Sequence, residues 1–183
     1  MVTTEVTSLA KAIRANLKLQ PGERLYTVVD ACQDAELAFE AETRFKVPIR
    51  MLFKGEASQY MRDVAPYFIP IDPASDYLER WAAAWGKNAG VLLTSAADPE
   101  KVFRHLREIF VVKDEAGQEY FFRFYDPRVL RAYLPTCTPE QAAEFFGPVS
   151  SCFCAAEALE SLLRFTIDKS GVRREVVEVI RCV

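Results

Sequence analysis

Apolar residues recur at helical spacing along much of the chain. Over residues 4–18 they form one face, which predicts an amphipathic helix. The same spacing predicts helices over residues 32–45, 58–62, 75–86, 98–110, 127–133 and 138–146. Start signals support three of these helices, because Asp98 and Asp126 each precede a proline and Thr138 opens a capping box.

Short apolar runs rich in β-branched and aromatic residues predict strands between the helices. These strands cover residues 25–29, 49–53, 68–71, 90–94 and 120–125. Pro70 suits an edge strand, because proline cannot donate a hydrogen bond to a neighbouring strand. The turn signal at Asp114–Gly117 makes the strand over residues 120–125 one arm of a hairpin.

The C-terminal tail lacks comparable helix caps. Residues 152–155, 162–167 and 172–180 are predicted as strands, and helix is the alternative over residues 155–165 and 173–181. Together these elements predict an α/β (mixed α+β) fold over residues 1–183. We expect a single domain of one or two lobes, with a central sheet flanked by helices and antiparallel strands at the C-terminus.

The stretch from Tyr120 to Leu130 combines aromatic residues with a cluster of charges. Its first half is predicted to be a buried strand that carries Arg123 among aromatic rings. In its second half, Asp126 before Pro127 is typical of a helix start, and Arg128 follows directly. Because charges are rarely buried without partners, these groups are expected to pair with one another or with a ligand.

This charge cluster has two interpretations. In the structural one, Asp126 caps a helix, Arg123 bonds to Asp126 or to nearby carbonyls, and Arg128 is solvated. In the functional one, the two guanidiniums recognise a carboxylate or a phosphate. The residue types favour the structural interpretation, because ion-pair networks that hold a fold outnumber anion sites.

Other polar residues could extend this cluster into an active site. Asp30 ends a strand, where it could cap the next helix, but open α/β sheets also place ligands at such strand ends. A small α/β enzyme, or a nucleotide- or anion-binding domain, would bring Asp30, Ser95 and His105 together with the charge cluster. His105 is the only histidine, and no nucleophile motif accompanies it, so a helix-surface position is the favoured interpretation.

Composition narrows the class of protein. A net charge of −3 without a basic stripe argues against a nucleic-acid partner. No apolar run reaches membrane-spanning length, and the N-terminus lacks the apolar core of a secretory signal, so a cytoplasmic protein is expected. The five cysteines lack paired metal-ligand spacing and are expected to be free, buried thiols.

An ordered set of segments resembles a known family. The segments are residues 25–30, 52–55, 65–67, 90–95, 105–107, 123–130 and 146–148. In this order, over residues 24–150, they resemble the adaptor/chaperone family of bacterial type VI secretion, the Tap or Tec proteins, long catalogued as a domain of unknown function. The most specific part is the octet R-F-Y-D-P-R-V-L at residues 123–130, followed by F-G-P.

The resemblance implies a protein that is not an enzyme and needs no cofactor. Such adaptors act in the cytoplasm of Gram-negative bacteria, bind a cognate toxic effector and help load it onto the VgrG spike or its PAAR tip. The site residues that the resemblance and the charge cluster single out are Asp30, Arg123, Tyr125, Asp126, Pro127, Arg128, Gly147 and Pro148. We expect the octet to hold the fold more than to touch partners.

Two segments outside the shared pattern are candidates for partner contacts. The tail over residues 151–183 varies in the family, so partner choice could lie there. If the last strand of the tail has a free edge, that edge could accept an effector strand by β-augmentation. The helix over residues 4–18 is expected to be either a partner-binding element or a packed cap.

Overall fold

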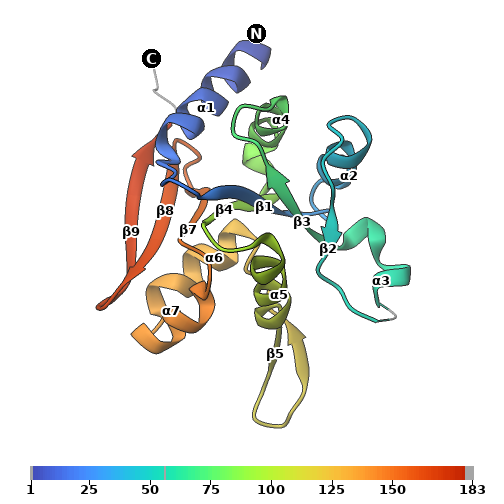
Figure 1. Ribbon diagram of the computed structural model, residues 1–183, viewed down its shortest axis with the longest axis vertical. Helices are drawn as coiled ribbons and strands as arrows, with labels where there is room; N and C mark the ends of the chain where they lie inside the picture. The colour runs from blue at the N-terminus through green and yellow to red at the C-terminus, as the bar shows by residue number, and fades with distance from the viewer. Residues whose placement is uncertain (1, 56, 180–183) are drawn as a thin grey trace.

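The computed structural model describes residues 2–55 and 57–179, and its centre is one antiparallel sheet (Figure 1). The strand order is β2-β3-β1-β4-β7-β8-β9. Its strands are β1 (Arg24–Asp30), β2 (Arg50–Met51), β3 (Pro66–Ile71), β4 (Gly90–Ser95), β7 (Ser151–Ala155), β8 (Ser161–Asp168) and β9 (Gly171–Glu178). A separate hairpin consists of β5 (Val111–Lys113) and β6 (Glu119–Phe121).

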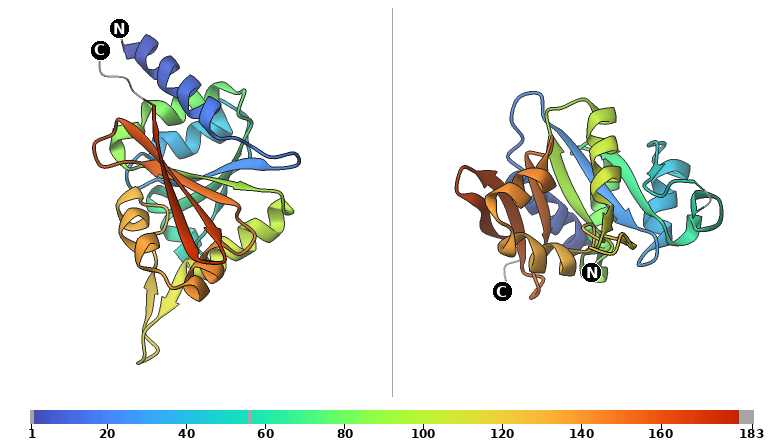
Figure 2. Two further views of the ribbon diagram at one scale, coloured as in Figure 1. Left: turned by 90° about the vertical axis from the view of Figure 1, so that its left-hand side faces the viewer. Right: turned by 90° about the horizontal axis from the view of Figure 1, so that it is seen from below.

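Helices cover both faces of this sheet (Figures 1 and 2). One face carries α1 (Val2–Asn16), α2 (Ala35–Thr43) and α4 (Asp76–Ala83). The other carries α5 (Pro99–Ile109), α6 (Pro127–Tyr133) and α7 (Pro139–Phe146). A short helix, α3 (Ala57–Tyr60), and three 3₁₀ segments, Arg62–Val64, Trp85–Lys87 and Leu134–Thr136, complete the described elements. The predicted mixed α+β fold with flanking helices is confirmed.

The interior strand β1 is buried on both faces, which explains its continuous apolar run. On one face Tyr26 stacks on Phe68 of β3, with ring centroids 4.8 Å apart, and Phe68 contacts Phe103 of α5. On the opposite face, Thr27 Oγ1 accepts a hydrogen bond of 3.0 Å from the indole of Trp81 in α4. Helix packing on both faces therefore fixes β1 as an interior strand of the sheet.

The two edges of the sheet differ. β2 pairs with β3 over two residues, so the far half of β3 has no neighbour on that side among the described residues. Leu52 N donates to Pro66 O, so the backbone groups of Pro66 point away from β1. Because the direction alternates along a strand, the backbone groups of residues 68 and 70 point outward as well. Pro70 thus occupies an outward-facing position where its missing N–H breaks no pairing, as expected for an edge.

Helix α1 is a packed cap. It buries Leu9, Ala10 and Ile13, and its closest helical neighbour is α4. Arg14 Nε donates to the carbonyl of Pro73, just before α4. The amphipathic pattern over residues 4–18 therefore reflects burial against the body of the protein.

Some sequence predictions were wrong in detail. The predicted strand over residues 120–125 ends at Phe121, and its first residues are exposed rather than buried. The helix predicted from residue 32 begins at Ala35, because Asp34, not Asp30, is its N-cap. The strand predicted over residues 49–53 shortens to Arg50–Met51.

The tail prediction is confirmed, since β7, β8 and β9 form as antiparallel strands. Ile180, the last residue of the predicted third strand, and Cys182 lie outside the described residues. Over residues 2–55 and 57–179, no helix combines the length and the apolar character needed to cross a membrane.

Candidate interaction surface

An ion network forms where the C-terminal end of β1 meets the start of α6. Arg123 donates to the buried carboxylate of Asp30 across 2.7 Å and lies 3.6 Å from Asp126. Arg128 binds Asp126 with two parallel contacts, Nε–Oδ1 at 3.0 Å and Nη2–Oδ2 at 2.7 Å. Two carboxylates and two guanidiniums compensate one another, so the network presents no uncompensated positive charge to an anion.

The two carboxylates of this network differ in their titration. Burial raises the pKa of Asp30, although Arg123 and the amide of Cys32 oppose this effect. Burial acts on Asp126 too, but the hydrogen bonds from the side chain and amide of Arg128 outweigh it and lower the pKa of Asp126. Asp126 is therefore the better stabilised of the two anions.

Asp126 also starts helix α6. Its Oδ1 accepts from the amide of Arg128 at 2.9 Å, and Pro127 occupies the first helical position. The predicted cap is confirmed. Arg128 is not simply solvated, as the structural interpretation had it, because it forms the paired contact with Asp126 while its side chain stays half exposed.

Tyr125 is buried beside this network. Its ring packs near Phe124 and near Phe110, the residue that follows α5, and burial raises the pKa of its hydroxyl. Asp30 and Arg123 are its charged neighbours. Tyr125 and Pro127, which is also buried, thus join the ion network to the core.

Gly147 and Pro148 lie at the other end of the strands. Ser95, the last residue of β4, donates to the carbonyl of Pro148 at 2.5 Å. His105 Nε2 donates to the carbonyl of Phe145 at 2.8 Å, and its ring lies against Gly147. His105 is half-buried between α5 and α7, and the predicted position on an open helix surface is wrong in this respect.

The single active site considered from the sequence does not form. Because β1 and β4 are antiparallel, Ser95 lies opposite Arg24, at the far end of β1 from Asp30. Six residues of strand separate the two ends by about 20 Å. The strand-end argument for Asp30 was also wrong, since it applies to parallel sheets and this sheet is antiparallel. The predicted site residues therefore divide into two separate groups.

The segments that carry the family resemblance contact one another in the fold. Arg107 donates to the carbonyls of Leu52 and Phe53, at 3.2 and 3.0 Å. Asp30 pairs with Pro66 where β1 meets β3, and the contacts of Arg123 and His105 link further pairs of segments. These residues have structural partners, which agrees with the expectation that the octet holds the fold.

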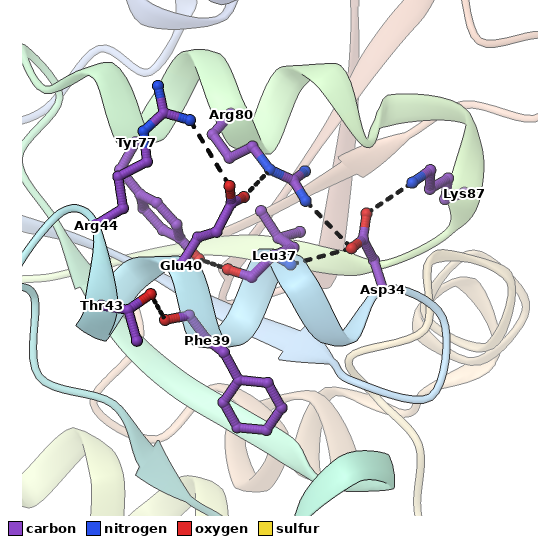
Figure 3. A network of polar contacts seen from close by, with 9 residues as sticks. All are labelled: Asp34, Leu37, Phe39, Glu40, Thr43, Arg44, Tyr77, Arg80 and Lys87. Atoms are coloured by element: carbon purple, nitrogen blue, oxygen red, sulfur yellow. Dashed lines mark hydrogen bonds and ion pairs between the residues drawn. The ribbon is translucent and has the colours of Figure 1, made fainter.

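A second ion network was missed by sequence reasoning (Figure 3). The buried carboxylate of Asp34 accepts from the amide of Leu37, from Lys87 at 2.9 Å and from Arg80 at 3.2 Å. Arg80 also bonds to Glu40. These contacts lower the pKa of Asp34 although its burial acts in the opposite direction. The sequence signal was a capping aspartate before an apolar run, but Asp30 offered the same signal four residues earlier.

The four cysteines within residues 2–55 and 57–179 are free thiols, but the expectation that they are buried is wrong for Cys32. Cys152 and Cys154 are buried in β7, and burial raises the pKa of both. Cys32 is exposed and Cys137 is half-buried. In the part of the chain that the structure describes, no three His, Cys, Asp or Glu side chains are arranged to hold a metal ion.

Exposed apolar side chains gather on the β5–β6 hairpin. Val112 and Tyr120 are a cross-strand pair on its outer face, and they are 42% and 53% exposed. Phe121, on the inner face, stacks on Phe110 with ring centroids 4.9 Å apart and contacts Phe53 at 5.1 Å. The hairpin is therefore attached to the core through Phe121 and projects its outer face to solvent (Figure 1). Sequence reasoning found the hairpin but placed its aromatic residues inside.

An open groove runs beside this hairpin, between α5, α6 and α7. Its apolar walls are formed by Ile109, Val111, Phe122, Tyr133 and Phe145. Its polar rim is formed by Glu108, Lys113, Gln141 and Glu144. The outer face of the hairpin and the groove share Val112, so together they make one continuous surface, called the hairpin–groove surface below. An apolar centre with a polar rim is the usual composition of a protein interface.

The sequence was compared with models of protein families. Residues 25–144 match the family described as Domain of unknown function (DUF4123). The chain belongs to this family. The matched residues contain Asp30, the octet and the hairpin–groove surface up to Glu144, whereas Gly147, Pro148 and β7 to β9 follow them. No curated protein and no solved structure matches the chain.

Proposed function

We propose that this protein is a non-catalytic adaptor of type VI secretion, which binds a cognate toxic effector and helps load it onto a VgrG spike protein or its PAAR tip. The observation that carries the proposal is the exposed apolar pair Val112 and Tyr120 on a projecting hairpin. Contiguous exposed apolar side chains rimmed by polar groups are typical of sites that bind other proteins. The resemblance of the ordered segments to the Tap or Tec adaptors supplies the identity of the partners.

The composition of the groove supports an effector segment as the occupant. On its rim above the apolar walls, Glu108 and Glu144 are acidic, while the basic Lys113 is already paired with Glu119 at 3.1 Å. A segment with apolar side chains and nearby basic residues complements such a surface. The bound segment would bury Val112 and Tyr133 at the centre of the contact and leave the acidic rim to select its charge.

The ion network at Asp30 and Asp126 supports a positioning role over an anion-binding one. Arg123 and Arg128 both have carboxylate partners within 3 Å. Asp126 fixes the start of α6, and α6 carries Tyr133 into the wall of the groove. The octet would thus shape the proposed binding surface without touching the partner.

The proposal is tested by affinity purification of the tagged full-length chain from its native cells, read by mass spectrometry. We expect recovery of a large toxin-like protein together with a VgrG or PAAR protein. Val112→Glu should reduce that recovery at least tenfold, because it places a charge in the apolar centre of the surface. Val64→Glu is the matched control, since Val64 is also 42% exposed but lies on a 3₁₀ segment outside the surface.

Two results would contradict this scheme. Recovery of neither partner by the wild-type chain at native abundance would refute the adaptor function. Loss of both partners with Val64→Glu, and retention with Val112→Glu, would refute the hairpin–groove surface as the binding site.

A further inference from the structure

The last strand of the sheet, β9, has an outward row of backbone groups whose identity follows from the register. Asp168 pairs with Gly171 across a two-residue turn, and Val179 N donates to Glu160 O at the other end of the strand. Residues 171, 173, 175, 177 and 179 therefore bond to β8 and its continuation. The amides and carbonyls of residues 172, 174, 176 and 178 point away from the sheet.

No strand within residues 2–55 and 57–179 pairs with this outer edge of β9. Among the described residues, no hydrogen bond involves the four outward amides, and the left view of Figure 2 shows β9 in front of the other elements. The side chain of Val176, at the middle of the edge, is 56% exposed. β9 contains no proline to block pairing with a further strand.

The charges on this edge are self-complementary. Arg174 lies two residues before Val176 and Glu178 two residues after it, so all three side chains point to one face. Both charged side chains are exposed, and neither has an ion-pair partner within residues 2–55 and 57–179. When two such strands run antiparallel with Val176 opposite Val176, Arg174 of each copy lies opposite Glu178 of the other.

Two neighbouring registers of the same strands place like charges opposite each other. Shifting the centre of the pairing to residue 175 places Glu175 opposite Glu175, and shifting it to residue 174 places Arg174 opposite Arg174. Like charges directly opposite each other destabilise a strand pair, whereas opposite charges stabilise it. The register centred on Val176 therefore pairs Arg174 with Glu178 without placing like charges opposite each other, whereas a shift to residue 177 would separate these two side chains.

We propose that β9 pairs with β9 of a second copy of this chain, around a two-fold axis at Val176. The pairing would form about six backbone hydrogen bonds from the outward groups of residues 174, 176 and 178. It would add two Arg174–Glu178 ion pairs and cover the exposed Val176. The contact is small compared with obligate dimer interfaces, so the dimer forms reversibly and depends on concentration.

Sedimentation velocity of the full chain over a concentration series tests the pairing. The wild-type chain should shift from monomer to dimer as its concentration rises. Glu178→Arg should weaken the dimer at least tenfold, because Arg174 would then face an arginine. The double variant Arg174→Glu/Glu178→Arg should restore the dimer to within a few-fold of wild type, because the opposite charges face each other again.

Two controls separate pairing from misfolding. Lys169→Glu, a charge reversal at the exposed β8–β9 turn, should leave the dimer unchanged. Val176→Pro removes an outward N–H that β8 does not use, so it should give a folded monomer by circular dichroism. A wild-type chain that stays monomeric throughout, or a double variant that stays as weak as Glu178→Arg, would overturn the proposal.

The outcome is independent of the proposed adaptor function, because recovery of the effector and spike proteins is measured in a separate experiment. If the chain stays monomeric and still recovers the effector and spike proteins, self-pairing is refuted and the β9 edge is available to a strand of another protein. A dimer that recovers neither would leave the self-association intact and remove the adaptor function.

Discussion

Gly147 has a φ of +48°, and a Cβ atom built on it would lie 2.4 Å from Cε1 of His105. The first property favours glycine, and the second excludes any side chain unless the histidine ring moves. His105 cannot move freely, since its ring also bonds to the carbonyl of Phe145. This one residue therefore sets how closely α7 approaches α5.

We expect Gly147→Ala to lower the free energy of unfolding by about 2–4 kcal/mol, from backbone strain together with overpacking. Gly117→Ala is the matched control, because Gly117 also has a positive φ, +80°, but nothing lies within 4 Å of its Cβ position. That control should lose only about 1–2 kcal/mol. Equal losses in urea unfolding would refute the contact with His105 as the cause.

Asp126 provides a second prediction at this scale. Asp126→Ala removes the cap of α6 and leaves Arg123 and Arg128 without their shared anion, so stability should fall by about 1–2 kcal/mol. Arg128→Ala should cost less than about 1 kcal/mol, because the Arg128 side chain is half exposed. Thermal unfolding of the two variants measures the difference, and a larger loss for Arg128→Ala would contradict this ranking.

Local sequence signals predicted which residues cap helices, but they did not predict contacts between residues far apart in the chain. The caps at Asp98, Asp126 and Thr138 depend on neighbours within three residues, and all three are confirmed. The partner of Arg123 is 93 residues away, at Asp30, and no local pattern indicates that distance.

At the scale of elements, composition gave the wrong secondary structure where aromatic residues are buried by contacts between elements. Residues 122–125 have the aromatic composition of a strand, yet no strand forms there, because Phe122 and Phe124 pack against Tyr133 and Phe145 of the helical layer. Asp30 and Asp34 carry the same capping signal. Only the fold decides between them, since Asp30 is still part of β1.

The network around Asp34 joins α2 to α4 and gives a pH-dependent prediction. The pKa of Asp34 is lower in the folded chain than its ordinary value of 3.8. The ionised carboxylate therefore contributes its full stabilisation of the fold above pH 3.8, and this stabilisation disappears as the pH falls through the lowered pKa. Asp34→Asn should lower stability by about 1–3 kcal/mol at pH 7. The difference from wild type should shrink as the pH falls below about 4.

Urea unfolding between pH 7 and pH 2.5 measures this difference. Glu42→Gln, which removes an exposed carboxylate from the same helix, serves as the control and should run parallel to wild type. A gap between Asp34→Asn and wild type that stays constant down to pH 2.5 would contradict the lowered pKa of Asp34.

At the scale of the whole molecule, the sheet joins residues inside the family match to residues outside it. β4 pairs with β1 on one side and with β7 on the other, and β7 to β9 follow residue 144. Strand existence was predictable from apolar runs, but strand order was not. The separation of Ser95 from Asp30 became visible only once β1 and β4 were paired.

A fragment limited to residues 25–144 should therefore fail to unfold cooperatively. It would expose the edge of β4 that pairs with β7 at residues 92–94 and lose the packing of α1 on α4. Denaturant titration followed by tryptophan fluorescence distinguishes the outcomes, because the full chain should give one sigmoidal transition. A fragment with the same sharp transition would show that the remaining segments are accessory.

The unequal edges of the sheet have a consequence for assembly. A protein whose sheet could be extended at both sides would join copies without end and form filaments. Here the far side terminates in a two-residue strand and the outward-facing Pro70, which offers no N–H to an incoming chain. Within residues 2–55 and 57–179, β9 offers the one long open edge, so the proposed pairing of two copies there would close the assembly at a dimer and leave both ends of the joined sheet blunted.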